Sequence, residues 1–331
     1  MTNSSLALKT YPQDFVVTED LDIELDGQGE HLWLWVEKVG LDTAWAAKCL
    51  AKAYGIGPAR VSWSGRKDRH AVCRQWFSLH LGLAESLPGP LPEGLTILGA
   101  TRHGRKLRVG THKGNYFQIL LRGQSEDLSA RWQTLVQQGV PNWFGEQRFS
   151  ANNYQQAMAW MAGQYQPKKH ERDMLLSSVR SQVFNELLAQ RVADGSWQQL
   201  RLGELCLLGD GQSCFVNLAQ QAEENAQRCA RGEIQPSLPL IGRQGKTLPQ
   251  DQALMFEHQG LEPFAPQQQW LSQLGLQQAR RACRFWPTQA SMVQQEQSVE
   301  LSFRLTKGCY ATALLKELCH YELQSTEYPT E

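Results

Sequence analysis

The feature that most constrains the fold of this chain is its hydrophobic period, which changes from alternating to helical and back to alternating. A period of two is typical of strands that bury one face, whereas an apolar residue every three or four positions is typical of amphipathic helices. The alternating pattern occupies both ends of the chain and the helical pattern occupies its middle. We therefore expect the two ends to form one sheet domain, with the middle inserted into it.

The individual elements follow from the same patterns. The predicted strands are residues 15–21, 31–39, 75–81, 106–110, 115–122 and 298–305. A helix is expected from Asp42, a preferred N-cap residue type, to about Tyr54, where a glycine-rich sequence ends it. Helical stripes run through residues 128–136, 154–161 and 176–187, and a short helix is expected over 311–320.

Composition limits the class of protein. The chain has 331 residues, of which 41% are hydrophobic and 20% charged, as in ordinary globular proteins of about two domains. No apolar run approaches the roughly twenty residues of a membrane span. The first residues also lack the pattern of a signal peptide, so we expect a cytoplasmic protein without a membrane partner.

The eight cysteines are scattered and include no CxxC pair. This spacing favours reduced, separately buried thiols over a disulfide framework. A zinc site needs closely spaced cysteine and histidine pairs, so we expect no metal. Glycine-rich nucleotide loops are also missing, which gives no support for a nucleotide cofactor.

The formal net charge is zero, but the charges are segregated. Residues 102–113 read RHGRKLRVGTHK, with five lysines and arginines and no acid, whereas residues 19–26 are strongly acidic. Segregation of this kind is expected of a protein that grips a phosphate backbone on one face. Ordinary solvated surfaces remain an equally good explanation of any single run.

One acidic residue, Asp68, stands among basic residues in the sequence Gly65-Arg66-Lys67-Asp68-Arg69-His70-Ala71-Val72-Cys73. A carboxylate in a cationic pocket stays ionised and oriented, which suits a nucleophile or base beside a polyanionic substrate. From local chemistry alone, a surface loop of salt-bridged charges is the commoner explanation.

Other segments carry possible contacts to RNA. Residues 142–149 combine aromatic rings, amides and an arginine, which suit stacking on an exposed base, although a tight turn at a domain junction explains them as well. Asn115 and Phe117 lie two residues apart in a predicted strand and so share a face. Residues 307–312 form a glycine turn that leads into a helix.

These segments form an ordered series along the chain. The series is Lys9-Thr10-Tyr11-Pro12-Gln13-Asp14-Phe15-Val16-Val17-Thr18-Glu19, Gly65 to Ala71, Leu107-Arg108-Val109-Gly110, Lys113-Gly114-Asn115-Tyr116-Phe117, Gly139 to Phe149 and Gly308-Cys309-Tyr310-Ala311-Thr312. With these motifs in register, the chain resembles the tRNA pseudouridine synthase D (TruD) family over nearly its whole length.

The resemblance implies an α+β fold: a pseudouridine synthase catalytic domain with a mixed, largely antiparallel sheet, interrupted by an inserted, mainly helical α/β domain. The catalytic domain would take residues 1–138 and 286–331, and the inserted domain residues 139–285. The implied reaction is isomerisation of a tRNA uridine, typically at position 13, without metal or organic cofactor. Nothing in the resemblance demands an obligate protein partner, and we expect a monomer.

The resemblance also implies roles for particular residues. Asp68 matches the essential aspartate of the family, and Phe117 a ring that stacks near the flipped base. Phe15, Asn115 and Tyr310 match positions that contact substrate. Lys9 and Lys67 are expected to hold Asp68 ionised or to contact phosphate. The sequence departs from the usual family pattern at Arg66, Ser150 and Tyr310, and these differences bear on substrate preference.

Two other classes compete with this interpretation. A noncatalytic protein that binds structured RNA would use the same basic faces and aromatic rings, but a carboxylate inside a phosphate-facing loop would weaken simple binding. An RNA methyltransferase normally needs a glycine-rich cofactor loop after a strand, and none is found.

Overall fold

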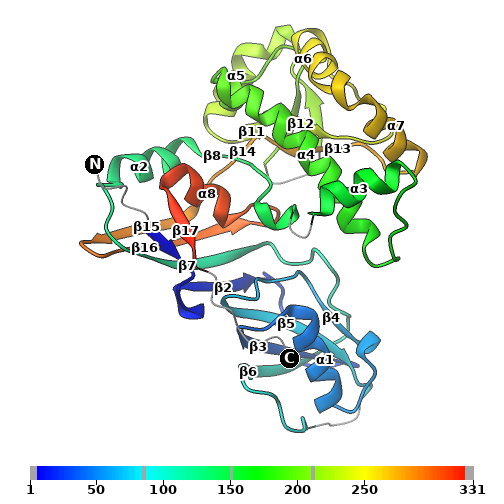
Figure 1. Ribbon diagram of the computed structural model, residues 1–331, viewed down its shortest axis with the longest axis vertical. Helices are drawn as coiled ribbons and strands as arrows, with labels where there is room; N and C mark the ends of the chain where they lie inside the picture. Colours follow the sequence, from blue (N-terminus) through cyan, green and yellow to red (C-terminus); the bar gives the residue numbers. More distant parts are fainter. Residues whose placement is uncertain (1–5, 84–86, 150–151, 210–212, 325–331) are drawn as a thin grey trace. The chain divides into compact units, whose positions relative to one another are not determined.

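The computed structural model describes residues 6–83, 87–149, 152–209 and 213–324 (Figure 1). The chain divides into two units, each compact in itself. Unit 1 consists of Met1–Gln137, Pro287–Ala311 and Leu315–Glu331, and unit 2 consists of Gln138–Trp286 and Thr312–Leu314. Segments from both ends of the chain therefore belong to the same unit.

Unit 1 is built on a ten-stranded sheet. Its strands are β1 (Leu6–Leu8), β2 (Phe15–Asp20), β3 (His31–Val39), β4 (Val61–Trp63), β5 (Val72–His80), β6 (Leu95–His103), β7 (Gly114–Arg122), β15 (Thr288–Gln295), β16 (Ser298–Thr306) and β17 (Tyr321–Leu323). The order is β15-β16-β7-β2-β5-β3-β6, with β1 beside β7 and β17, and β4 beside β5. Only the β1–β17 and β2–β5 pairs are parallel, which confirms the predicted mixed, largely antiparallel sheet.

Most residues of three helices also belong to unit 1: α1 (Thr43–Ala53), α2 (Ser129–Gln138) and α8 (Ala311–Leu318). The prediction of α1 is confirmed, because the Asp42 carboxylate accepts hydrogen bonds from the N–H groups of Ala44 and Trp45 at 2.7 and 3.2 Å. The apolar face of α1, centred on Leu50, packs on buried side chains of β3 and β5, including Leu34 and Phe77.

The predicted strand over residues 106–110 is wrong. The strand in this region is β6, and the segment that follows it is an irregular loop. Leu107, which is 1% exposed, inserts beside Trp33 and Leu21, and its N–H donates to the Ser78 Oγ at 3.2 Å. The buried leucine between basic residues therefore gave the alternation of apolar and polar residues that is typical of a strand, although this segment is a loop.

The parallel pairing of β2 with β5 positions the candidate site. Val16 lies opposite Val72, so both strands begin at the same edge of the sheet. The loop that carries Asp68 runs directly into β5, and Phe15 is the first residue of β2. Because parallel strands point in one direction, residues just before each strand are brought together.

Unit 2 contains the remaining helices and three small sheets. The helices are α3 (Asn153–Met161), α4 (Arg172–Ala193), α5 (Ala222–Ala230), α6 (Asp251–Leu261) and α7 (Ala265–Gln273). The strands are β8 (Val140–Pro141), β9 (Leu205–Leu208), β10 (Cys214–Val216), β11 (Ile234–Gln235), β12 (Ser237–Leu240), β13 (Ala279–Ala282) and β14 (Arg284–Phe285). The long helix α4 supplies most of the buried core, including Val183, Phe184 and Leu187.

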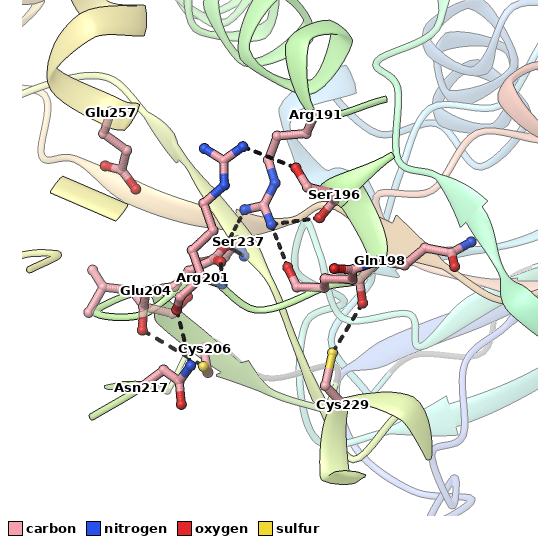
Figure 2. A network of polar contacts seen from close by, with 12 residues as sticks. Arg191, Ser196, Gln198, Arg201, Glu204, Cys206, Asn217, Cys229, Ser237 and Glu257 are labelled. Atoms are coloured by element: carbon pink, nitrogen blue, oxygen red, sulfur yellow. Dashed lines mark hydrogen bonds and ion pairs between the residues drawn. The ribbon is translucent and has the colours of Figure 1, made fainter. Parts of the chain in front are cut away.

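A buried polar network lies beside α4 in unit 2 (Figure 2). Arg191 and Glu204 form an ion pair with both side chains 1% exposed, and the same Glu204 oxygen accepts from the N–H of Ser237 at 3.1 Å. Arg280 binds Glu257 through two hydrogen bonds of 2.7 and 3.0 Å and also donates to Ser237. The network therefore joins α4, α6 and the strands of this unit.

None of the eight cysteines is in a disulfide, as predicted, but only five are buried: Cys49, Cys214 and Cys309 are half-buried. Burial raises the pKa of Cys206 and of Cys283 to about 12. Among the described residues, no helix is long and apolar enough to cross a membrane, and no cluster of three or more histidine, cysteine or acidic side chains has the arrangement of a metal site.

Candidate active site

The candidate active site is an ion pair between Asp68 and Lys9. Asp68 lies in the loop before β5, and Lys9 follows β1 directly. The Lys9 Nζ lies 2.7 Å from Asp68 Oδ2, and the two side chains are 11% and 18% exposed. A carboxylate held by an ammonium group and still partly open to solvent is both oriented and accessible.

An unusual backbone conformation directs Lys9 to this position. Its φ angle is +61°, in the left-handed region that few non-glycine residues adopt. The ammonium group also lies 4.2 Å from the centroid of the Phe15 ring, a cation–π distance. Phe15 thus fixes the lysine from one side while Asp68 holds it from another.

The rings of Phe15 and Phe117 lie in contact with each other and are well packed. Phe15 is 2% exposed and meets Phe117 edge-on, with centroids 6.0 Å apart. Phe117 is 8% exposed and stacks on Phe303 at 5.4 Å. In this arrangement Phe117 supports the site as part of its aromatic core, and one of its faces is covered by Phe303.

Lys67 is not at the same place as Lys9, although it precedes Asp68 in sequence. Its Nζ lies 2.8 Å from Glu19 Oε1, with side chains 4% and 0% exposed. The other Glu19 oxygen accepts from the N–H of Trp76 at 3.0 Å. This buried pair ties the Asp68 loop to β2, and Lys67 does not face solvent where a phosphate would lie.

Asn115 lies on β7, and Tyr310 follows β16, the strand that pairs with β7. Asn115 is half-buried near the start of β7, opposite Glu19 on β2 and Leu305 on β16. Its side-chain oxygen Oδ1 is shielded from solvent and has no hydrogen-bond partner among the residues that the structure describes. Tyr310 is half-buried at the N-cap of α8, shortly after β16 ends.

The basic segment of residues 102–113 begins at the end of β6 and continues as a loop, with exposed cations at Arg105, Lys106 and Arg108. Behind them, His112 Nδ1 lies 2.7 Å from the buried Ser64 hydroxyl, which also accepts from the His112 N–H. Burial lowers the pKa of His112, and the charge of Lys67 lowers it further. The exposed cations are suited to phosphate contacts, whereas His112 stabilises the loop through its hydrogen bonds with Ser64.

The aromatic segment of residues 142–149 is engaged within unit 2. Asn142 is 5% exposed and binds the Ala282 carbonyl and the Arg281 guanidinium. The Phe144 ring meets Phe184 edge-on, and Arg281 lies 4.0 Å from its centroid. The alternative explanation, a packed turn, therefore fits Asn142 and Phe144 better than stacking on a base. Ser150, where the family pattern has glycine, lies outside the described residues.

Sequence reasoning missed several residues that hold the Asp68 loop. They are Glu19, Lys38, Thr43 and Gln75, all of them buried. A signal existed for Lys38, because it continues the buried positions of Leu34 and Val36 in the alternation of β3. A charged residue at an apolar position of a strand calls for a functional explanation.

Comparison with a solved structure shows the fold class. A structure from Methanosarcina mazei assigned to tRNA pseudouridine synthase D (TruD) superposes with a TM-score of 0.72. The alignment covers 96% of this chain and 94% of the other, at 18% sequence identity. At this identity the likeness concerns the fold.

Sequence comparisons define the family. The family model described as tRNA pseudouridine synthase D (TruD) matches residues 3–158 and 152–318. The protein named tRNA pseudouridine synthase D of Aeromonas salmonicida is 41% identical over 95% of this chain and 91% of its own length. The protein of the same name from Pseudomonas entomophila is 43% identical over 94% of this chain and 90% of its own. The chain belongs to the tRNA pseudouridine synthase D family.

Proposed function

We propose that this chain isomerises uridine 13 of tRNA to pseudouridine and that Asp68 is its catalytic carboxylate. Membership of the family supports the reaction class and the tRNA substrate. The observation that carries the assignment of Asp68 is its ion pair with Lys9, 2.7 Å long and partly open to solvent.

The reaction breaks the bond between ribose C1′ and uracil N1 and forms a bond between C1′ and C5. The proton on C5 is lost and N1 gains one, so the product is an isomer and no oxidant or external group is required. The target nucleotide must leave the base stack before these atoms are accessible.

An oriented, ionised carboxylate can serve this reaction in two ways. It can add to C1′ as a nucleophile, or it can take a proton from the ribose as a base. Both routes need the carboxylate beside the sugar, and the positive charge of Lys9 favours its ionised form. Asn115, which is half-buried, would contact the substrate, and Phe15 would support Lys9.

Lys67 has a different role in this proposal from the one that its sequence position indicates. Its buried pair with Glu19 anchors the loop, so it acts behind Asp68 and not on a phosphate. Phosphate contacts are assigned to the exposed cations Arg105, Lys106 and Arg108.

We further propose that residues 139–285 are the inserted domain of the family within a catalytic domain of residues 1–138 and 286–331. The enzyme would act in the cytoplasm as a monomer, with tRNA as its partner and without an obligate protein partner. It would use no metal or organic cofactor.

The test is to map pseudouridine in an unmodified tRNA transcript incubated with the purified chain. We expect one new pseudouridine, at position 13, and none in a matched transcript that carries cytidine at that position. Tight tRNA binding without any pseudouridine would instead identify the chain as a noncatalytic RNA-binding protein.

A further inference from the structure

The buried lysine Lys38 is a charged group that the proposed mechanism does not yet use. It lies on β3 with 0% exposure, on the face that also buries Leu34 and Val36. Strand alternation therefore places an ammonium group where an apolar side chain would be expected. Taking such a charge out of water is costly unless its hydrogen bonds are replaced.

The Lys38 ammonium group donates to two main-chain carbonyls and lies beside the Cys73 thiol. Its Nζ donates to the Asp68 carbonyl oxygen at 2.6 Å and to the Leu41 carbonyl oxygen at 2.8 Å. Within the described part of the chain, Lys38 forms no ion pair with a carboxylate. The Cys73 thiol, on the neighbouring strand β5, also donates to the Asp68 carbonyl, at 3.4 Å. The ammonium group is therefore directed at the backbone of the candidate catalytic residue.

The electrostatics of this position are unfavourable for stability alone. Burial lowers the pKa of Lys38, and the nearby Cys73 and Asp68 only partly offset this effect. Replacing a whole buried ion pair by apolar residues is often neutral for stability, whereas removing Lys38 alone would leave the Asp68 and Leu41 carbonyls without this donor. A methionine at this position would preserve the apolar packing of the strand but not these two hydrogen bonds, so stability must be measured beside activity.

Other residues hold the rest of the loop. The Thr43 hydroxyl accepts from the Lys67 N–H at 3.0 Å, and the Gln75 amide donates to the Gly65 carbonyl at 3.2 Å. Those bonds fix the residues before Asp68. Lys38 instead binds the carbonyl of Asp68 itself, while Lys9 binds its carboxylate.

We propose that Lys38 is a positioning residue for the isomerisation: it holds the main chain of Asp68 from the buried side, so that the carboxylate meets Lys9 and the ribose at the correct place. This inference rests on the proposed function of Asp68. Lys38 does not touch the substrate; it acts through Asp68 alone.

The experiment compares Lys38→Met with the wild-type chain in single-turnover reactions on a tRNA transcript, together with the dissociation constant for the same tRNA. We expect the rate of the chemical step to fall by about 100-fold, the loss typical of a displacement of about 1 Å at a reacting group. The dissociation constant should remain unchanged, because Lys38 lies inside the protein.

A control variant separates positioning from general destabilisation. Leu50→Ala removes a fully buried side chain of α1 that packs beneath the sheet. Both variants are melted, and their rates are compared at a temperature where each is folded. Lys38→Met should lose far more activity than Leu50→Ala for an equal or smaller drop in melting temperature.

Two results would overturn the proposal. One is a wild-type rate in Lys38→Met, and the other is a loss no greater than that of Leu50→Ala at matched stability. Neither result would affect the proposed function, which is tested by the wild-type chain on the same transcript. If the wild-type chain forms no pseudouridine, the proposed function itself fails. If Lys38→Met does not fold, Lys38→Gln, which keeps a donor but removes the charge, takes its place with the same control.

Discussion

Unit 1 and unit 2 both bury charged side chains, but the carboxylate of the candidate site in unit 1 is more exposed than the central carboxylate of the network in unit 2. In unit 2, Glu204 is 1% exposed and accepts hydrogen bonds from Arg191, Ser237 and the N–H of Arg201. In unit 1, Asp68 is 18% exposed and its ammonium partner Lys9 is 11% exposed. One carboxylate is enclosed by donors, whereas the other remains partly open to solvent.

This difference in exposure distinguishes carboxylates that stabilise the fold from carboxylates that can react with a substrate. A buried carboxylate whose lone pairs are all engaged joins elements of the fold, and removing one partner leaves the other without compensation. A carboxylate that solvent can reach can also meet a substrate. Unit 1 contains both kinds, because the Lys67–Glu19 pair is about as buried as the Arg191–Glu204 and Arg280–Glu257 pairs of unit 2.

The largest effect is expected from Asp68→Asn. The amide keeps the size of the side chain and a hydrogen bond from Lys9 but removes the negative charge, so pseudouridine formation should fall below detection. Melting temperature and tRNA binding should stay close to wild type. The control is Asp173→Asn, an exposed carboxylate on α4, which should retain full activity. Pseudouridine formed by Asp68→Asn at the wild-type rate would remove this residue from the mechanism.

Glu204→Ala should produce the next largest effect, on folding. It leaves Arg191 buried without its carboxylate, which typically costs about 3–5 kcal/mol of unfolding free energy. Denaturant unfolding measures this cost. The matched variant is Lys9→Met, which breaks a more open pair and should lower turnover with a much smaller loss of stability. If both variants changed stability equally, the distinction between the two units would be lost.

A smaller effect is expected when Arg105 and Lys106 are both changed to glutamine. Losing two phosphate contacts should reduce the slope of log affinity against log salt by roughly 1 to 2. Binding titrations at several salt concentrations measure the slope. The control is the pair Lys48 and Lys52, which are exposed on α1. An unchanged slope in the first variant would place the phosphate contacts on other cations.

The smallest effect concerns His112. Burial lowers the pKa of His112 below its ordinary value of 6.5, so the unfolded chain takes up a proton at a higher pH than the folded chain. Stability therefore falls as the pH drops through 6.5 and below. His112→Gln should make the unfolding free energy less dependent on pH between 5 and 7. Part of the pH dependence should remain, because burial also lowers the pKa of His31 and His70. A steeper pH dependence in the variant would contradict this assignment.

Much of unit 1 could be predicted because its local signals agree with its packing. The strand over residues 31–39 and the helix capped by Asp42 are found where the sequence placed them. Strands β1 and β17 were not predicted, since three residues show no period and depend on pairing with distant strands. A strand was wrongly predicted at residues 106–110 because one buried leucine does not show whether the residues beside it are paired with another strand.

The site was only partly accessible from sequence for a similar reason. Asp68 and Lys9 belong to motifs that can be compared along the chain, but their 2.7 Å contact joins residues 59 positions apart. The sequence alone does not show whether Lys9 or Lys67 pairs with Asp68. In the folded sheet Lys67 pairs with Glu19 instead. The proposed role of Lys38 depends on a hydrogen bond to a main-chain carbonyl, and because every residue has such a carbonyl, the sequence does not show which one is bound.

The parallel junction of β2 and β5 also limits how the gene for such a protein can change length. Lys9 is connected to Phe15 by a short turn, and Asp68 to Val72 by the end of its loop, so both partners are tethered within a few residues of the paired strands. One residue added to or removed from an extended chain moves its end by about 3.3 Å. An insertion or deletion of one codon in either tether would therefore separate the lysine from the aspartate, whereas length changes between β5 and β6 would leave them together.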